Sequence, residues 1–323
     1  MPVISAPHEL LDSGVYVDLR AALGRPLYLK CEGFNFAGSV KMRTAAGLVA
    51  AAEAEGRLGP DKILIESSSG NLGLALAIIA AGKGIRFVCV TDPRCNPTTL
   101  RLLRAVGAEV VVVSEADEER GFLHSRLEYV RRRCAEDPRY VWLDQYANPA
   151  NWIAHYESTA AEIAKQFPDL DLLFVGVGTG GTLTGCARYF RDNGDRVRVV
   201  AVDAVGSVTF GQPPARRLIP GLGTSVRPPL LDPSVAADVV HVAEVDTIRR
   251  CRELAARGLL FGGSTGTVLG GALEWLDTHD PDGQLTAVAI APDLGERYVD
   301  TIYDDAWVSA HFGADVLEHL ANA

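Results

Sequence analysis

Lysine is scarce in this chain. Only five of its 323 residues are lysines, against 26 arginines, so a catalytic lysine is not hidden among many solvated ones. Lys62, Lys83 and Lys165 occupy ordinary positions for a charge: before a strand, at a helix end and on a polar helix face. Lys30 alternates with apolar neighbours, as an outward-facing strand residue does. Lys41 alone follows a glycine turn and begins an alanine-rich helix. It is either a functional amine facing a cleft or a solvated helix lysine.

Other absences narrow the class of protein. No apolar run is long enough to span a bilayer, and the first residues lack the basic segment and apolar core of a signal peptide. A net charge of −10 argues against nucleic acid or an anionic membrane as partner. The six cysteines are scattered without a C-x-x-C pair, which predicts buried thiols rather than disulfides or a metal site. We therefore expect a cytoplasmic protein.

The remaining pattern is that of an α/β protein. Short apolar runs alternate with helical periodicity, which predicts parallel sheets with helices on both faces, in two lobes or one large unit. Strands are expected at 26–31, 63–66, 86–91, 109–114, 140–143, 172–177, 197–203, 239–242 and 285–291. Helices are expected at 41–58, 71–81, 98–106, 150–166, 183–190, 247–257 and 267–276. Residues 206–234 hold six prolines and no periodicity, so they form either a surface loop beside an active site or a plain linker.

Two glycine- and serine-rich turns follow predicted strands, where ligands bind in open α/β sheets. The first is Glu66-Ser67-Ser68-Ser69-Gly70-Asn71, which could hold a carboxylate and a ring substituent or simply cap a helix. The second is Gly178-Thr179-Gly180-Gly181-Thr182, whose backbone N–H groups could cradle a phosphate. Because Gly176-x-Gly178-x-x-Gly181 also fits a dinucleotide fingerprint, with Asp203 as the ribose-binding acid, an NAD-linked oxidoreductase is a rival interpretation.

A third turn, Phe261-Gly262-Gly263-Ser264-Thr265-Gly266-Thr267, again opens a helix. The dinucleotide interpretation gives no role to Lys41, Asn71 or Ser264. Pyridoxal 5′-phosphate gives a role to these three residues and to the glycine turn at 178–182, because it carries one aldehyde, one phosphate, one phenolic oxygen and one ring nitrogen. Lys41 would form the Schiff base, residues 178–182 would hold the phosphate, Asn71 the phenolic oxygen and Ser264 the ring nitrogen.

The chain resembles the cysteine synthase family of fold-type II pyridoxal-phosphate enzymes. The resemblance runs from about residue 26 to 305 and is carried by Gly38-Ser39-Val40-Lys41, Ser68-Ser69-Gly70-Asn71, Asp144-Gln145-Tyr146-Ala147-Asn148-Pro149-Ala150-Asn151, Gly178-Thr179-Gly180-Gly181-Thr182, Ile219-Pro220-Gly221-Leu222-Gly223 and Gly295-Glu296-Arg297-Tyr298. It implies a tryptophan synthase β-like fold and a homodimer, with a large cofactor domain of residues 1–44 and 148–323 and a smaller mobile domain of residues 45–147. It also implies that Ser68, Ser69, Asn71 and Gln145 contact the α-carboxylate of the substrate.

The family's chemistry agrees with a serine at position 264. A neutral hydroxyl does not keep the pyridine nitrogen protonated, so the ring is a weaker electron sink than one paired with a carboxylate. Such a ring suits β-elimination from an activated L-serine, with Lys41 as general base on the Cα proton, followed by addition of a nucleophile at Cβ.

Several residues depart from the usual pattern of this family and indicate a particular branch of it. Leu72 stands where a threonine is usual, Met42 follows the lysine where an acidic residue is common, and residues 14–19 replace the usual threonine-proline-leucine entry. Together with Ser264–Val268 and Ile219–Ser225, these features resemble the branch that makes 2,3-diaminopropionate precursors for siderophores from O-phospho-L-serine and L-glutamate. Arg216, Arg217 and Arg227 are either donors for such anionic substrates or surface charges. The alternatives are a sulfide-using cysteine synthase and a catalytically silent relative that binds a partner protein.

Overall fold

The computed structural model describes residues 3–11, 14–117, 121–194 and 196–321. It divides into two compact units, the first formed by Met1–Asp12 and Asn35–Ala154, the second by Ser13–Phe34 and His155–Ala323. These boundaries differ from the expected ones at 44/45 and 147/148. Helix α2 (Lys41–Ala54) is continuous across the expected boundary at 44/45 and contacts α3 and α6 of the first unit. Lys41 therefore lies in the first unit. The expected outer limits of the large domain, residues 1 and 323, lie outside the described residues.

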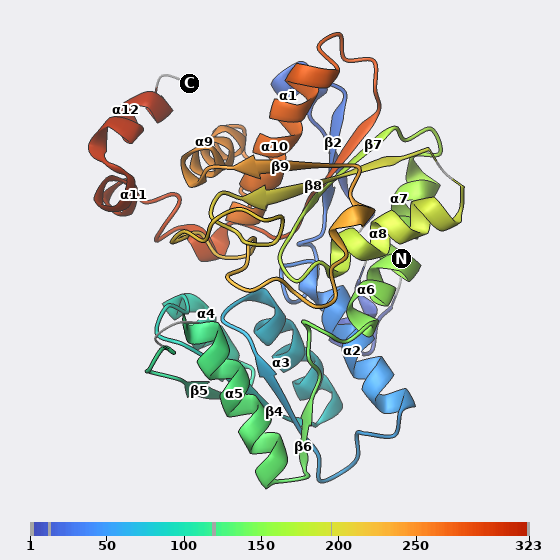
Figure 1. Ribbon diagram of the computed structural model, residues 1–323, viewed down its shortest axis with the longest axis vertical. Helices are drawn as coiled ribbons and strands as arrows, with labels where there is room; N and C mark the ends of the chain where they lie inside the picture. The colour runs from blue at the N-terminus through green and yellow to red at the C-terminus, as the bar shows by residue number, and fades with distance from the viewer. Residues whose placement is uncertain (1–2, 12–13, 118–120, 195, 322–323) are drawn as a thin grey trace. The chain divides into compact units, whose positions relative to one another are not determined.

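The first unit contains a four-stranded parallel sheet in the order β5-β4-β3-β6. Its strands are β3 (Ile63–Ser67), β4 (Arg86–Thr91), β5 (Glu109–Val112) and β6 (Tyr140–Trp142). Its helices are η1 (Pro7–Glu9), α2, α3 (Asn71–Lys83), α4 (Pro97–Ala105), α5 (Gly121–Glu136) and α6 (Ala150–Ala154). Figure 1 shows α3 and α5 beside these strands.

Both faces of this sheet are buried because alternate strand residues point into two different clusters. Ile63 and Ile65 pack with Val130 of α5 on one face. Leu64 packs with residues of α2, α3 and α4 on the other. The near-continuous apolar strands follow from this double cover.

The second unit contains a six-stranded sheet in the order β1-β2-β10-β7-β8-β9, parallel except for β1. Its strands are β1 (Tyr16–Asp18), β2 (Leu27–Cys31), β7 (Leu172–Gly176), β8 (Arg198–Ala204), β9 (Asp238–Val242) and β10 (Ala287–Ala291). Its helices are α1 (Arg20–Leu23), the π-helical turn η2 (His155–Ala160), α7 (Ala161–Gln166), α8 (Gly181–Asp192), η3 (Pro233–Val235), α9 (Glu244–Ala255), α10 (Gly263–His279), η4 (Glu296–Tyr298), α11 (Asp305–Phe312) and α12 (Ala314–Ala321).

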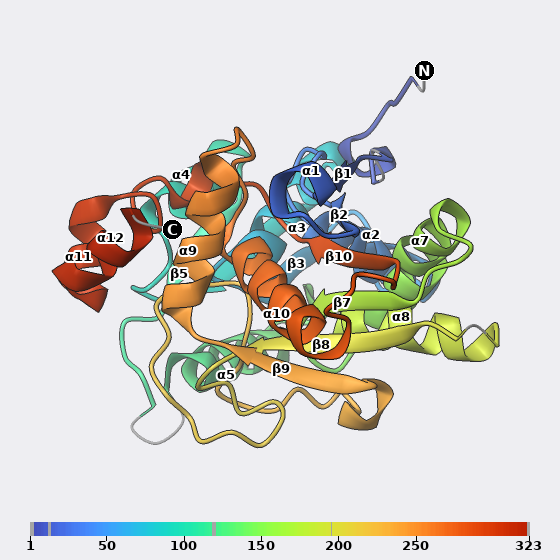
Figure 2. The ribbon, with the colours of Figure 1, turned by 90° about the horizontal axis from the view of Figure 1, so that it is seen from above.

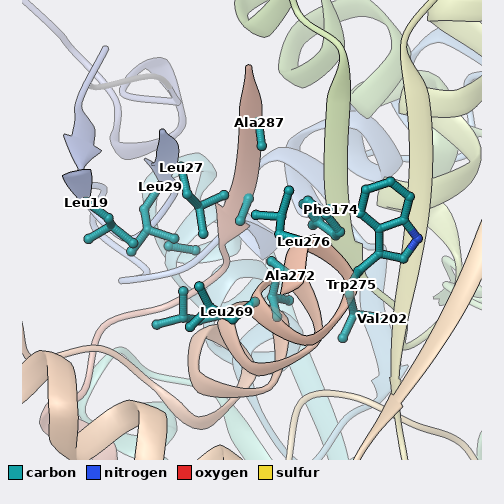
Figure 3. Packing of buried hydrophobic residues seen from close by; sticks show 14 of the residues in the cluster. Leu19, Leu27, Leu29, Phe174, Val202, Leu269, Ala272, Trp275, Leu276 and Ala287 are labelled. Atoms are coloured by element: carbon teal, nitrogen blue, oxygen red, sulfur yellow. The ribbon is translucent and has the colours of Figure 1, made fainter. Parts of the chain in front are cut away.

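Helix α10 supplies the centre of the second core. It contacts β7, β8, β9 and β10 (Figure 2). Figure 3 shows Leu269, Ala272 and Leu276 of this helix among side chains of the sheet, including Phe174 of β7 and Val202 of β8. The opposite face of the sheet is covered by α8 and by Ile163 of α7. Because both faces of the sheet are packed, its strands are held in place, and so are the turns that follow them, including the candidate site turn after β7.

The expected α/β architecture is confirmed, with parallel sheets covered on both faces. Residues 206–232 form a loop without helix or strand, as expected. The structure adds strand β1 and the π-helical turn inside the helix expected at 150–166.

The expectation for Lys30 is wrong. Its side chain is 1% exposed, and its Nζ lies 2.9 Å from Glu162 Oε2 and 3.4 Å from Glu32 Oε1. Burial alone lowers the pKa of Lys30, but attraction to Glu32, Tyr16 and Glu162 outweighs it and raises that pKa well above the ordinary value. The face of β2 that carries Lys30 is covered by helix α7, which supplies Glu162, and is not exposed to solvent.

Among the described residues, no helix is long and apolar enough to cross a membrane. No group of three or more His, Cys, Asp or Glu side chains suited to a metal ion occurs in the same described part of the chain. The six cysteines are free thiols, and all except the half-buried Cys134 are buried, in agreement with the sequence.

Candidate active site

Lys41 is the first residue of α2 and is half-buried. The preceding loop is held by Asn35. Its Oδ1 accepts hydrogen bonds from the backbone of Ala37 at 3.0 Å and Ser39 at 3.4 Å, and its Nδ2 donates to Ser39 O at 2.9 Å. Gly38 turns the chain with φ 63°, a value that favours glycine. Local hydrogen bonds therefore fix the backbone just before the lysine, and the glycine turn expected from the sequence is present.

The turn between β3 and α3 presents Ser68, Ser69 and Asn71. Ser68 Oγ accepts from the backbone N–H of Gly73 at 2.9 Å and of Gly70 at 3.3 Å. The oxygen thus satisfies the start of α3, which is the capping role considered from sequence, while the hydroxyl proton can still be donated to an anion. Ser69 and Asn71 are half-buried at the same helix start. Such a turn suits a carboxylate.

Leu72 is 3% exposed and belongs to the apolar core of the first unit. This position, where a threonine is usual in the resembled family, therefore offers no hydroxyl to a ligand.

Gln145 lies beside this turn. Its Nε2 donates to Ser67 O at 2.9 Å, and its own carbonyl accepts from Asn151 Nδ2 at 2.7 Å. Gln145 is buried. The structure thus brings Gln145 together with the turn that holds Ser68, Ser69 and Asn71, as expected of groups that share one ligand.

The turn Gly178–Thr182 joins β7 to α8. Its N-cap, Gly180, has φ 87° and provides no side-chain cap for the helix start. Added Cβ atoms would lie 2.8 Å from Leu231 Cβ at position 180 and 3.1 Å from Gly221 O at position 178. Close packing and a positive φ therefore require glycine at position 180, and close packing disfavours a side chain at 178. The first-turn N–H groups lie at the positive N-terminal end of a 12-residue helix. This arrangement suits a phosphate.

A buried histidine supports the phosphate turn. His155 is fully buried in the π-helical turn, with Nε2 3.2 Å from Thr182 Oγ1 and Nδ1 2.9 Å from Thr159 Oγ1. Both ring nitrogens are thereby engaged. Sequence reasoning missed His155, because a π-helical turn inside an ordinary helical pattern has no clear sequence signal.

Ser264 lies at the start of α10 and is 3% exposed. Gly221 of the proline-rich loop passes so close that an added Cβ at 221 would collide with Ser264 Oγ. The same loop reaches the end of β7, where Gly223 N donates to Val177 O at 2.8 Å. The second unit therefore brings Gly178, Gly221 and Ser264 together. The loop borders the site and is not a plain linker.

The donors present fit pyridoxal phosphate. The second unit supplies a phosphate cradle that side chains larger than glycine would fill, and a neutral hydroxyl beside it. Asp203, the acid that a dinucleotide would require, is fully buried, and its Oδ1 accepts from Ala204 N at 2.8 Å. Burial raises the pKa of Asp203, although a hydrogen bond with Ser207 opposes this. A ribose cannot reach a carboxylate enclosed in this way, so the NAD interpretation is wrong.

Comparison with known proteins agrees with this class. Residues 16–293 match the family described as pyridoxal-phosphate dependent enzyme. The chain belongs to this family, and it is an enzyme that depends on pyridoxal phosphate.

Two curated proteins similar to this chain are amino-acid synthases with the same name. The chain is 44% identical over 322 residues to N-(2-amino-2-carboxyethyl)-L-glutamate synthase of Cupriavidus metallidurans, covering 97% of this chain and 94% of the relative. It is 43% identical over 285 residues to the Ralstonia nicotianae protein of the same name, covering 88% and 84%.

Among solved structures, O-ureido-L-serine synthase is similar with a TM-score of 0.85 and 34% identity, covering 95% of this chain and 100% of that one. A hydrogen sulfide-producing enzyme of Fusobacterium nucleatum has a TM-score of 0.85 and 29% identity, with 92% and 100% covered. Both similarities support the fold-type II assignment.

Proposed function

We propose that the chain catalyses β-replacement on O-phospho-L-serine with the amine of L-glutamate, giving N-(2-amino-2-carboxyethyl)-L-glutamate and phosphate. The observation that carries this proposal is the near full-length similarity to two synthases of that product. Leu72 supports it, because a buried leucine replaces the hydroxyl usual in cysteine synthases.

The chain's own residues divide the work. The hydroxyl of Ser68, the side chain of Ser69 and the amides of Asn71 and Gln145 would bind the α-carboxylate. The amine of Lys41 would carry the cofactor and then remove the Cα proton. Pyridoxal phosphate, when bound through residues 178–182 and Ser264, withdraws electrons from Cα. Because Ser264 is neutral, we expect it to accept or donate one hydrogen bond at the ring nitrogen without supplying charge.

The phosphate leaving group and the dicarboxylate nucleophile require positive donors. Arg217 donates to Gly206 O and, at 3.4 Å, to Ala215 O, so its guanidinium holds the proline-rich loop together. Arg216 and Arg227 are exposed on the same loop. We propose these two as substrate-binding candidates, because a guanidinium can hold a phosphate or carboxylate through paired N–H groups.

One experiment tests the proposal. Purified enzyme loaded with pyridoxal phosphate is incubated with O-phospho-L-serine or O-acetyl-L-serine, each with L-glutamate or sulfide, and products are identified by mass. We expect the glutamate adduct from phosphoserine. Rapid cysteine formation from acetylserine and sulfide without that adduct would leave a cysteine synthase, the second candidate. If no pair of substrates gives a product, the remaining interpretation is a catalytically silent relative that binds a partner protein. We also propose that the enzyme acts as a cytoplasmic homodimer, as the family resemblance implies.

A further inference from the structure

Glu66 is a fully buried carboxylate at the end of β3, one residue before the Ser67–Asn71 turn. It accepts three hydrogen bonds. Oε1 accepts from Ser67 N at 2.8 Å and from Trp142 Nε1 at 3.2 Å, and Oε2 accepts from Gln145 N at 3.3 Å. No part of the proposed mechanism uses this side chain.

These contacts close a ring between two segments far apart in the sequence. The carboxylate of Glu66 binds the backbone of Ser67 and of Gln145, and the side chain of Gln145 returns to Ser67 O at 2.9 Å. Asn151 Nδ2 in turn donates to Gln145 O at 2.7 Å. The turn after β3 and the segment after β6 are thereby fixed in one register. Both segments carry residues that would bind the substrate carboxylate.

We propose that Glu66 is a positioning residue, whose buried carboxylate ties the Ser67–Asn71 turn to Gln145 and so shapes the site for the substrate's α-carboxylate. The inference rests on the proposed function only in assigning that carboxylate to this turn. Glu66 touches no substrate. It acts through the backbone of its two neighbours, so its loss should affect carboxylate recognition more than recognition of the rest of the ligand.

The charge on this carboxylate changes near neutral pH. Burial raises the pKa of Glu66 to about 7, and nearby Asp144 adds to the rise, while the hydrogen bonds from Ser67, Trp142 and Gln145 oppose it. The other titratable groups that face it are Cys134 of α5, Cys89 of β4 and Tyr146. A protonated carboxyl group carries no charge and is a weaker acceptor, so protonation weakens the hydrogen bonds from the N–H groups and loosens the tie.

The test compares two ligands that differ only at the carboxylate. The enzyme loaded with pyridoxal phosphate is titrated with L-serine and with L-serinamide, and binding is followed by the change in cofactor absorbance. The ratio of the two affinities, compared between enzyme variants at the same pH, isolates carboxylate recognition, because the lysine and ligand-amine titrations are common to all variants compared. Glu66→Gln keeps the size but replaces one acceptor by a donor. We expect it to reduce the serine-to-serinamide ratio about 3- to 10-fold, as expected for one lost hydrogen bond.

The pH profile gives a second readout. The ratio of the unaltered enzyme, divided by that of Glu66→Gln at the same pH, should fall toward one as pH decreases through about 7. Trp142→Phe removes one donor to the ionised carboxylate, so it should move the midpoint to higher pH. This milder variant keeps the test valid if Glu66→Gln fails to fold.

Asp280→Asn is the matched control. Asp280 is also a buried carboxylate that accepts two backbone N–H groups, from Gln284 at 2.9 Å and Leu285 at 3.0 Å, but it lies between α10 and β10. The serine-to-serinamide ratio of Asp280→Asn should equal that of the unaltered enzyme. Equal weakening of both ligands by Glu66→Gln, an unmoved midpoint in Trp142→Phe, or a reduced ratio in Asp280→Asn would each overturn the proposal. L-Serine carries no activated leaving group, so the result does not depend on which nucleophile the enzyme uses.

Discussion

Replacing Gly221 by alanine should weaken binding of pyridoxal phosphate by displacing Ser264. Gly221 has φ 113°, and its added Cβ would collide with Ser264 Oγ. The loop backbone is anchored nearby by the bond from Gly223 to Val177, whereas a serine side chain rotates easily. The hydroxyl should therefore move. Loss of its hydrogen bond to the ring nitrogen is worth about 0.5–1.5 kcal/mol, which is about 2- to 12-fold in the dissociation constant.

The backbone adds a separate cost to stability. A non-glycine residue at positive φ costs about 1–3 kcal/mol, whether or not it touches the site. Gly211→Ala is the matched control, because Gly211 lies in the same loop with φ 85° and an added Cβ there would meet nothing within 4 Å. We expect Gly211→Ala to lower the free energy of unfolding without changing cofactor affinity.

A double-mutant cycle separates these effects. Dissociation constants for pyridoxal phosphate are measured by equilibrium dialysis for Gly221→Ala, Ser264→Ala and the pair. Because Ser264→Ala removes the colliding oxygen, the pair should bind the cofactor about as well as Ser264→Ala alone. Fully additive losses, or an equal loss of affinity in Gly211→Ala, would show that Gly221 does not act through Ser264.

Three further predictions concern the rest of the site. Thr182→Val should cost about 1–3 kcal/mol of unfolding free energy and weaken cofactor binding, because the buried hydrogen bond between the Thr182 hydroxyl and His155 Nε2 is lost. Thr184→Val, in the same helix, should be neutral or stabilising, because the buried Thr184 hydroxyl has no hydrogen-bond partner among the described residues; equal losses measured by denaturant unfolding would contradict this. Because the pKa of Glu66 is raised on folding, its contribution to the free energy of unfolding is fully present below about pH 4.5 and is lost as pH rises through about 7. Glu66→Gln should therefore gain about 3 kcal/mol relative to wild type over that range, and parallel pH profiles of unfolding would refute the assignment. Borohydride treatment should attach the cofactor to Lys41, and an adduct that survives Lys41→Ala or maps to another lysine would show that Lys41 is not the attachment residue.

Much of the fold could be predicted from the sequence because the signals are local. The glycine turn at 178–182 and the serine turn at 67–71 each follow an apolar strand and open a helix, and both are found there. Strand β4 was expected with the bounds Arg86–Thr91 that it has. Turn chemistry and strand periodicity depend on a few neighbouring residues, so one sequence suffices.

The parts that could not be predicted depend on contacts between distant segments. Lys30 has the alternation of an outward residue, but Glu162 lies 132 positions away and is brought to it by the fold. Glu66 precedes a recognisable turn, yet its partners Trp142 and Gln145 belong to another strand and loop. The approach of Gly221 to Ser264 likewise joins a loop to a distant helix start. Periodicity carries no information on such pairs.

The central claim is that an amino-acid amine, and not sulfide, attacks Cβ of the serine substrate. The most direct measurement offers the enzyme O-phospho-L-serine with equal concentrations of isotope-labelled L-glutamate and sulfide, and follows phosphate release and products by mass. We expect labelled N-(2-amino-2-carboxyethyl)-L-glutamate to form in an amount equal to the phosphate released, and Lys41→Ala to abolish both. Cysteine as the main product, with no label joined to the serine carbon skeleton, would contradict it.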